Sequence, residues 1–186
     1  MKERRFKTRS VEETLALGGR IAAMLHPPLI VILRGEVGAG KTTLVKGIAA
    51  ALGAAAEDEV TSPTFTIVHE YAGTSVRLFH LDLYRLAPGA DAALFAWEDY
   101  LDGSSLAFVE WPEAGAAELP PADVEVVLRH RTPRSRELEL RAAPAVEEAL
   151  AGEMTAAGID GVMLAPGAPP AAPGDGGDDD GDEATT

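Results

Sequence analysis

Residues 29–52 read LIVILRGEVGAGKTTLVKGIAAAL and combine the patterns of a strand, a loop and a helix. Residues 29–33 are aliphatic and mostly β-branched, which is typical of a buried parallel strand. Residues 35–42 match the phosphate-loop pattern G-x-x-x-x-G-K-[ST], and a helical pattern continues to Leu52. Because both the strand and the helix that this motif requires are present, the segment predicts an α/β phosphate-loop domain.

The loop has the residue types needed to bind a nucleotide and Mg²⁺. Its glycines let successive backbone N–H groups turn toward a phosphate without a Cβ atom in the way. The following helix adds the positive end of its dipole, Lys41 can reach the outer phosphates, and the Thr42 hydroxyl can hold Mg²⁺. The predicted nucleotide contacts are Gly35, Val37, Gly38, Ala39, Gly40, Lys41, Thr42 and Thr43. The alternative is a glycine-rich turn that binds nothing.

Composition limits the classes of protein to which the chain can belong. Its 186 residues suffice for one domain with a sizeable core, and 46% of them are hydrophobic. A formal net charge of −14 argues against sequence-independent nucleic-acid binding, which depends on Lys and Arg. The lack of cysteine excludes disulfides and Cys-based zinc sites. Since neither a signal segment nor an apolar run of ~20 residues is apparent, we expect a cytoplasmic protein that enters no membrane.

Local patterns predict further elements around the loop. Ser10 and Glu13 form a capping box, which indicates a helix from there to the prolines at 27 and 28. We expect strands at residues 65–71, 76–82, 105–109, 124–128 and 137–141, and helices at residues 90–101 and 144–158. The first two and the last two of these strands should form hairpins. Residues 1–160 should be the single domain, and residues 161–186 a disordered Pro/Gly/Asp-rich acidic tail.

Two strand ends and one loop carry the remaining candidate site residues. Asp82 could orient water or hold Mg²⁺ through water, or it could cap the following turn. Glu110 ends an apolar strand, as the acid that completes the Mg²⁺ shell in phosphate-loop proteins does, and with Thr42 it is our candidate metal ligand. His80 is interpreted as a hydrogen-bonded structural residue. A loop that could sense the γ-phosphate, or simply start a strand, consists of Thr61, Ser62, Pro63 and Thr64.

The segment at residues 129–136 is the basic patch of an otherwise acidic sequence. It contains four arginines, Arg129, Arg131, Arg134 and Arg136. These side chains could meet RNA phosphates, the acidic face of a partner or the nucleotide itself. They could equally form the solvated tip of a hairpin.

Four motifs, GEVGAGKTT, TSPTF, HLDLYR and VEWPE, occur in an order that resembles the TsaE (YjeE) family, bacterial ATPases of tRNA threonylcarbamoyladenosine biosynthesis. The resemblance covers residues 10–141. It implies a phosphate-loop domain whose sheet mixes parallel and antiparallel strands between flanking helices. It also implies a weak ATPase that supports the TsaB and TsaD proteins, which transfer a threonylcarbamoyl group to the adenosine beside the anticodon.

The resemblance also implies roles for individual residues. The catalytic set is Lys41, Asp82 and Glu110, the Mg²⁺ ligands are Thr42 and Glu110, and Trp111 lies near the nucleotide. Residues 61–64 match a switch-like loop, and the start of the first helix, near Val11 and Thr14, is suggested for adenine. One departure is Ala96-Trp97, where the family pattern has a glycine and an aliphatic residue. The acidic tail is not part of that pattern.

The expected reaction is in-line attack of water on the γ-phosphate of ATP. No arginine is clearly placed as a finger, so we expect slow turnover that partners accelerate. One alternative is a small-molecule kinase, whose lid could come only from residues 129–136. A second is a non-catalytic, ATP-gated assembly factor. A GTPase is disfavoured because no N-K-x-D segment is present.

Overall fold

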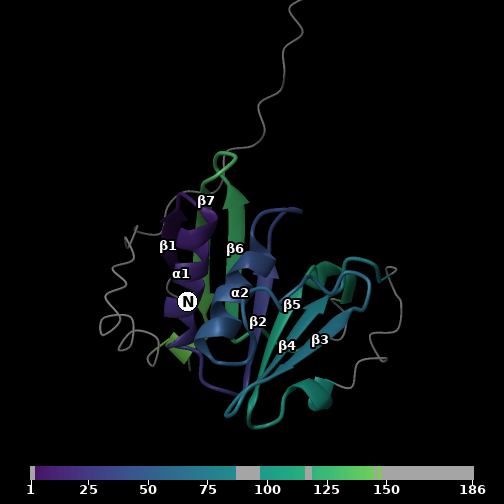
Figure 1. The fold of residues 1–186 in the computed structure, drawn as a ribbon. Helices are drawn as coiled ribbons and strands as arrows, with labels where there is room; N and C mark the ends of the chain where they lie inside the picture. The colour runs from purple at the N-terminus through teal and green to yellow at the C-terminus, as the bar shows by residue number, and fades with distance from the viewer. Residues whose placement is uncertain (1–2, 87–96, 116–118, 145, 148–186) are drawn as a thin grey trace, which may run out of the picture.

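The computed structural model describes residues 3–86, 97–115, 119–144 and 146–147. Its elements are β1 (Glu3–Thr8), α1 (Val11–Ala22), β2 (Leu29–Arg34), α2 (Lys41–Ala51), β3 (Val68–Ala72), β4 (Arg77–Asp82), η2 (Trp97–Tyr100), β5 (Ser105–Glu110), η3 (Pro112–Gly115), β6 (Val124–His130) and β7 (Arg136–Ala142). The seven strands form one sheet in the order β1-β7-β6-β2-β5-β4-β3 (Figure 1). β2 is parallel to β5 and β6, and β4 is parallel to β5. The pairs β1–β7, β6–β7 and β3–β4 are antiparallel, so the predicted mixed sheet is confirmed.

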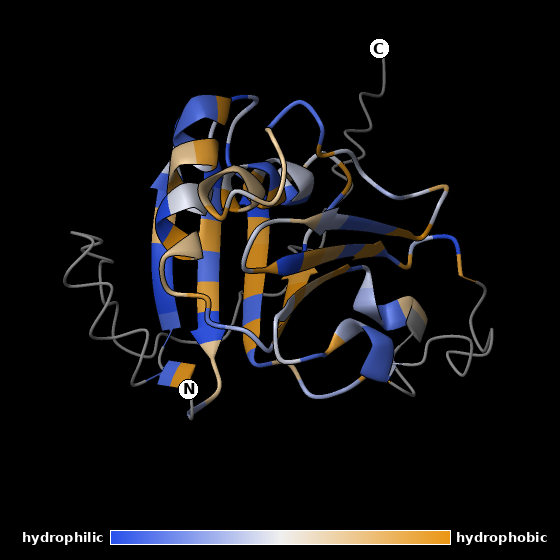
Figure 2. Cartoon of the chain, turned by 60° about the horizontal axis from the view of Figure 1, so that its bottom comes forward, coloured by the Kyte–Doolittle hydropathy of each residue, from blue (hydrophilic) through white to orange (hydrophobic). Residues whose placement is uncertain are grey.

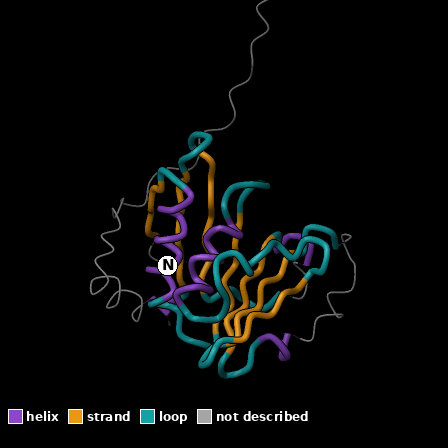
Figure 3. The backbone as a smooth tube through the Cα atoms, viewed as in Figure 1, coloured by secondary structure: helices purple, strands orange, loops and turns teal. Residues whose placement is uncertain are grey.

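The described helices α1 and α2 lie on the same face of the sheet (Figures 1 and 3). Their apolar residues form one buried cluster with the strand residues that point to this side. α1 and α2 touch through glycines: a Cβ atom on Gly47 would lie 2.1 Å from the carbonyl oxygen of Leu15, and one on Gly18 would lie 2.5 Å from that of Leu44. Only residues without a side chain permit this approach. The contact positions α1 beside the helix that carries the phosphate loop.

The opposite face of β2, β5 and β4 is covered by η2 and by neighbouring loops. A second apolar cluster there contains Phe79, Leu81 and Trp97. In Figure 2 the central strands are mainly orange, whereas the strand at the β1 edge is mainly blue. The central strands are buried on both faces, which explains their nearly continuous apolar sequence. Neither of the described α-helices combines the length and the apolar character that crossing a membrane would require.

Most predicted elements are confirmed, but the predicted start of one strand and the predicted end of one helix are wrong. The strand predicted at residues 65–71 begins only at Val68, because the carbonyl of Pro63 accepts hydrogen bonds from the N–H groups of Thr66 and Ile67, at 3.1 and 2.6 Å. Ile67 has a φ of 68°, and the resulting turn delays pairing with β4. The first helix ends at Ala22 instead of reaching the prolines, and the chain then turns to bury residues 24 and 25.

One strand was not predicted. β1 contains a single large apolar residue, Phe6, and its second buried long side chain is Arg4, which makes two hydrogen bonds to Glu147, of 3.0 and 2.6 Å. Such a strand depends on its pairing with β7, far away in the sequence.

Two predicted helices fall partly on residues that are not described. Within the helix predicted at residues 90–101, residues 97–100 form the short 3₁₀ segment η2, whereas residues 90–96 lie outside the described residues. Residues 144, 146 and 147 are helical, as predicted for the closing helix. The remainder of that helix and the tail at residues 161–186 also lie outside the described residues.

Candidate functional site

The carboxyl ends of β2, β5 and β4 meet at one edge of the sheet, where α2 begins. In the parallel register, Leu33 of β2 lies opposite Glu110 of β5, and Glu110 lies opposite Asp82 of β4. The phosphate loop follows directly after β2. The two acidic residues that end predicted strands are therefore brought together beside the loop.

The glycines of the loop have the backbone conformation that an anion-binding nest requires. Gly35, Gly38 and Gly40 have φ angles of 146°, 75° and 103°, which side-chain-bearing residues rarely adopt. A Cβ atom on Gly35 would also lie 2.4 Å from the carbonyl oxygen of Leu128 in β6. Gly40 is the N-cap of α2 and offers no side-chain cap. The first N–H groups of α2 can therefore donate to an anion.

The Lys41 side chain is buried at this edge of the sheet, in contact with the loop backbone, Glu110 and Trp111. Its Nζ donates to the carbonyl oxygens of Gly35 (2.8 Å) and Glu36 (3.1 Å). The same atom lies 3.5 Å from Glu110 Oε2 and 4.6 Å from the ring centre of Trp111. The ammonium is thus held against its own loop by groups that a phosphate could replace.

Glu110 contacts three polar side chains of this site, those of Thr42, His80 and Lys41. It is only 3% exposed, and its Oε1 accepts hydrogen bonds from Thr42 Oγ1 (3.1 Å) and His80 Nε2 (2.9 Å). Hydroxyl and carboxylate oxygens suit Mg²⁺, which keeps several waters and needs few protein ligands beside phosphate oxygens. Among the described residues no group of three or more His, Asp or Glu side chains could hold a metal. The fit to a cation therefore rests on Thr42 and Glu110 together.

Asp82 is buried and holds the Ser-Pro-Thr loop against the site. Its Oδ2 accepts hydrogen bonds from Thr64 Oγ1 and from Ser62 Oγ, the latter at 3.2 Å. Its Oδ1 also caps the turn after β4 by accepting from the N–H of Tyr84 at 3.0 Å. Ser62 and Thr64 thus use their hydroxyls mainly on Asp82 and not on local backbone. Thr61 is exposed and its N–H donates to Tyr71 Oη at 3.2 Å.

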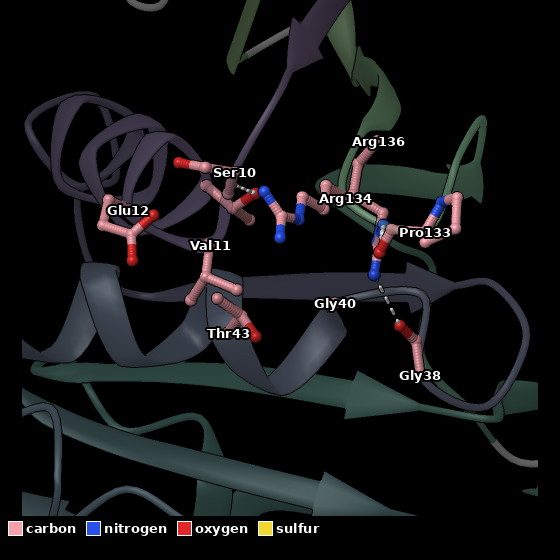
Figure 4. Close-up of a pocket in the computed structure, with 10 residues that line it drawn as sticks. Ser10, Val11, Glu12, Gly38, Gly40, Thr43, Pro133, Arg134 and Arg136 are labelled. Carbon is pink, nitrogen blue, oxygen red and sulfur yellow. Dashed lines mark hydrogen bonds between the residues drawn. The ribbon is translucent and has the colours of Figure 1, made fainter.

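Two cavities flank the phosphate loop. One, of about 350 Å³, is lined by Ser62, Thr64, Asp82, Glu110, Trp111 and the loop with the start of α2. We call it the acidic cavity. The other, of about 360 Å³, lies between α1, the loop and the β6–β7 turn, and Figure 4 shows its lining. We call it the hairpin cavity. Gly38, Gly40 and Thr43 line both, so a ligand on the loop could extend into each.

Comparisons with known proteins agree with this geometry. A model of the family described as threonylcarbamoyl adenosine biosynthesis protein TsaE matches residues 8–138. The chain belongs to the TsaE family. The resemblance inferred from its motifs is confirmed.

Individual relatives match over most of their length. The TsaE protein of Treponema pallidum is 37% identical over 131 residues, covering 70% of this chain and 95% of that protein. The TsaE protein of Bacillus subtilis is 33% identical over 155 residues, covering 83% and 96%. A crystal structure of Bacillus subtilis YdiB superposes with a TM-score of 0.67 at 31% identity, covering 83% of this chain and 95% of that one.

The basic segment of this TsaE-family chain divides into two parts. Arg129 and Arg131 pair with buried acids of β7, Glu139 and Glu137. The side chains of Arg134 and Arg136 instead line the hairpin cavity, and Arg136 Nη2 donates to the Gly38 carbonyl oxygen at 3.4 Å. In Figure 4, Arg134 points across this cavity toward Ser10 and Val11. Of the roles considered for these arginines, the position of this second pair favours the nucleotide.

Sequence reasoning missed several residues of this edge. Tyr84 packs its ring against Trp111, with ring centres 4.9 Å apart, and Ser10 was considered only as a helix cap. The prediction that His80 is hydrogen-bonded is confirmed, but its partner, Glu110, was not foreseen. One available signal was that His80 precedes Asp82 by two residues and therefore lies on the same face of the strand. Val11 and Thr14, suggested for adenine, do line the hairpin cavity.

Proposed function

We propose that this chain binds Mg·ATP, hydrolyses it slowly, and in doing so supports the formation of threonylcarbamoyladenosine in tRNA with the TsaB and TsaD proteins. The observation that carries the proposal is the convergence of Lys41, Thr42, Asp82 and Glu110 on one cavity beside the glycine loop, in a TsaE-family chain. TsaE is the name of proteins of threonylcarbamoyladenosine biosynthesis.

The loop and Lys41 would hold the phosphates. Backbone N–H groups at positive-φ glycines can surround phosphate oxygens, and the ammonium can exchange the carbonyl oxygens of Gly35 and Glu36 for the outer phosphates. Gly38, Ala39, Gly40, Thr43 and the exposed Val37 would supply further contacts. Trp111, under the lysine, would restrict where that ammonium can move.

Thr42 and Glu110 would hold the cation. The Thr42 hydroxyl donates its proton to Glu110, so its oxygen lone pairs remain available to a metal. When bound, Mg²⁺ supplies charge neutralisation at the β- and γ-phosphate oxygens. Glu110 would keep the hydroxyl oriented toward that position.

Asp82 would orient the attacking water. It faces Glu110 across the parallel strands and binds the hydroxyls of the Ser-Pro-Thr loop. A γ-phosphate that competes for Ser62 and Thr64 would alter this loop, which is how a switch-like segment could respond to the nucleotide. Positioning and charge stabilisation are the main contributions that a protein makes to such a reaction.

The hairpin cavity would take the nucleoside. Val11 and the alkyl part of Arg134 provide flat or apolar surface, while Ser10 and Arg136 provide polar atoms. This cavity shares Gly38, Gly40 and Thr43 with the acidic cavity that Asp82 lines, so one nucleotide bound on the loop could occupy both.

Partner proteins would accelerate the reaction. No arginine lines the acidic cavity in the described part of the chain. An arginine supplied by a partner can increase phosphoryl-transfer rates by ~10³ to 10⁵. ATPase rates measured with and without TsaB and TsaD test this point, and equal rates would contradict it.

The decisive experiment is nucleoside analysis of tRNA from cells depleted of this protein. Loss of threonylcarbamoyladenosine, restored by the wild-type chain but not by Lys41→Ala, is expected. An unchanged nucleoside content would refute the assigned pathway. A kinase would transfer label from γ-labelled ATP to an acceptor, whereas the proposed hydrolase releases labelled phosphate. A non-catalytic assembly factor would still restore the nucleoside with Asp82→Ala.

A further inference from the structure

His80 is the most deeply buried polar side chain at the edge of the sheet beside the phosphate loop. It is 0% exposed, it lies within β4, and its backbone pairs in register with Phe108 of β5 and His69 of β3. Its Nε2 lies 2.9 Å from Glu110 Oε1, whereas its Nδ1 has no hydrogen-bond partner among the described residues. Burying a polar group without a partner costs free energy that an apolar residue would avoid. Packing alone therefore does not explain a histidine here.

The contact determines which nitrogen of His80 carries hydrogen. An ionised carboxylate can only accept hydrogen bonds, so Nε2 donates to Glu110 and Nδ1 retains a lone pair. This tautomer is assigned from the partner of the ring. The imidazole thus acts toward Glu110 as a fixed, buried donor.

This donor separates the tasks of the two Glu110 oxygens. Oε1 receives His80 and Thr42, and Oε2 faces Lys41 at 3.5 Å. Without His80, the carboxylate could turn both oxygens toward the ammonium, because that ion pair would be its strongest remaining contact. The Thr42 hydroxyl would then lose its acceptor and its fixed orientation.

We propose that His80 is a positioning residue of the Mg²⁺ site, which holds Glu110 in the orientation that presents the Thr42 hydroxyl to the cation. The inference rests on the Mg·ATP binding proposed above. It assigns to His80 the part that hydrogen-bonded partners of metal ligands commonly have, whose loss weakens metal affinity or activity by ~10- to 100-fold.

The test compares ATP binding with Mg²⁺ and with EDTA by calorimetry, in wild type and three variants. His80→Leu removes the donor and keeps an apolar side chain in the core. His80→Gln places an amide N–H near the position of Nε2. Phe108→Leu is the matched control, because Phe108 is fully buried beside His80 on the adjacent strand. Thermal melting of each variant reports stability separately.

We expect His80→Leu to weaken binding by ~10-fold or more with Mg²⁺ and to leave binding in EDTA unchanged. His80→Gln should recover most of the Mg²⁺ effect, and Phe108→Leu should lower the melting temperature without changing the ratio of the two affinities. The inference is overturned if His80→Leu leaves the ratio unchanged, including the case in which it weakens binding equally with Mg²⁺ and with EDTA, as Phe108→Leu would. Such a result leaves the proposed function standing. If His80→Leu does not fold, His80→Phe takes its place, because a phenyl ring stays in the core but has no hydrogen to donate to Glu110. A lowered ratio in that variant supports the inference, and an unaltered ratio overturns it. A wild-type protein that gains no affinity from Mg²⁺ overturns the proposed function as well.

Discussion

Glu110 and Glu139 are both 3% exposed and both pair with cationic side chains, yet they belong to very different regions. Glu139 lies on the face of β7 that carries charged residues, where Arg129, Arg141 and Arg5 surround it. The side chains of these arginines are 55%, 40% and 35% exposed. Glu110 is instead held by Lys41, at 5% exposure, and by His80, at 0%.

The difference shows that burial of an acid does not by itself indicate function. Around Glu139, solvent-exposed guanidinium groups neutralise the charge and can remain hydrated. Around Glu110, buried groups hold the carboxylate at the wall of the acidic cavity, where a ligand can reach it. We therefore take Glu110, and not Glu139, as the candidate functional carboxylate, because its partners leave it at the wall of a cavity.

If acids at the wall of the acidic cavity are functional, Asp82→Asn should have the largest effect, because Asp82 lines that cavity together with Glu110. The amide keeps an acceptor for Ser62 and Thr64 but removes the charge that would orient water. We expect ATP turnover to fall by ~10² to 10⁴, with little change in ATP affinity. Single-turnover phosphate release and calorimetry measure the two quantities. Unchanged turnover would remove Asp82 from the reaction.

Lys41→Ala should act on binding. Loss of a buried charge contact to phosphate costs about 2–5 kcal/mol, so ATP affinity should fall by roughly 30-fold or more. Lys46→Ala provides the control, because Lys46 lies on the same helix and does not line either cavity. Equal affinities of the two variants would show that the charge at residue 41 is not used.

Gly47→Ala tests the contact between α1 and α2, the helix that begins at the phosphate loop. The new Cβ atom would lie 2.1 Å from the Leu15 carbonyl oxygen, a backbone atom that cannot move by itself. Overpacking of this kind costs about 1–3 kcal/mol of unfolding free energy. Gly19→Ala is the matched control, since its Cβ atom would come no closer than 3.6 Å to a neighbour. Urea unfolding that gives both variants the same stability would contradict the close approach of α1 and α2.

Glu139→Gln should have a smaller effect. Because its arginine partners can be hydrated, we expect a loss of about 1 kcal/mol or less in unfolding free energy, and no change in Mg·ATP affinity. Glu110→Gln should instead lose the benefit of Mg²⁺. If Glu139→Gln weakened Mg·ATP binding in calorimetry, the two regions would not be separable as described.

The smallest effect concerns Asp102, before β5. The hydroxyl of Ser105, the N–H and hydroxyl of Ser104, and Arg77 hold the pKa of Asp102 well below its ordinary value. A lowered folded pKa contributes stability above the ordinary aspartate pKa of ~4, and this contribution is lost as the pH falls below it. The stability difference between wild type and Asp102→Asn should therefore shrink between pH 5 and pH 2, and it should be small because Asp102 is exposed to solvent. A difference independent of pH would contradict the shift.

Sequence patterns predicted the features that depend on neighbouring residues. The phosphate loop, the strand-end acids and both hairpins follow from local periodicity and motif spacing. The wrong start of β3 has a different origin: residues 65–67 alternate like a strand, but the N–H groups of Thr66 and Ile67 donate to the Pro63 carbonyl in a turn, and the strand begins only at Val68. β1 was missed because its stability comes from β7 and from Glu147.

The amino acids alone were enough to predict phosphate binding, because the strand, the glycine loop, Lys41 and Thr42 lie within 14 consecutive residues, 29–42. The tertiary structure decided which distant side chains join it: His80 reaches Glu110 only through the β4–β5 register, and Arg134 and Arg136 reach the loop only because β6 lies beside β2. Strand order and register are set by packing over the whole sheet. Such contacts between residues far apart in the chain leave no local pattern to read.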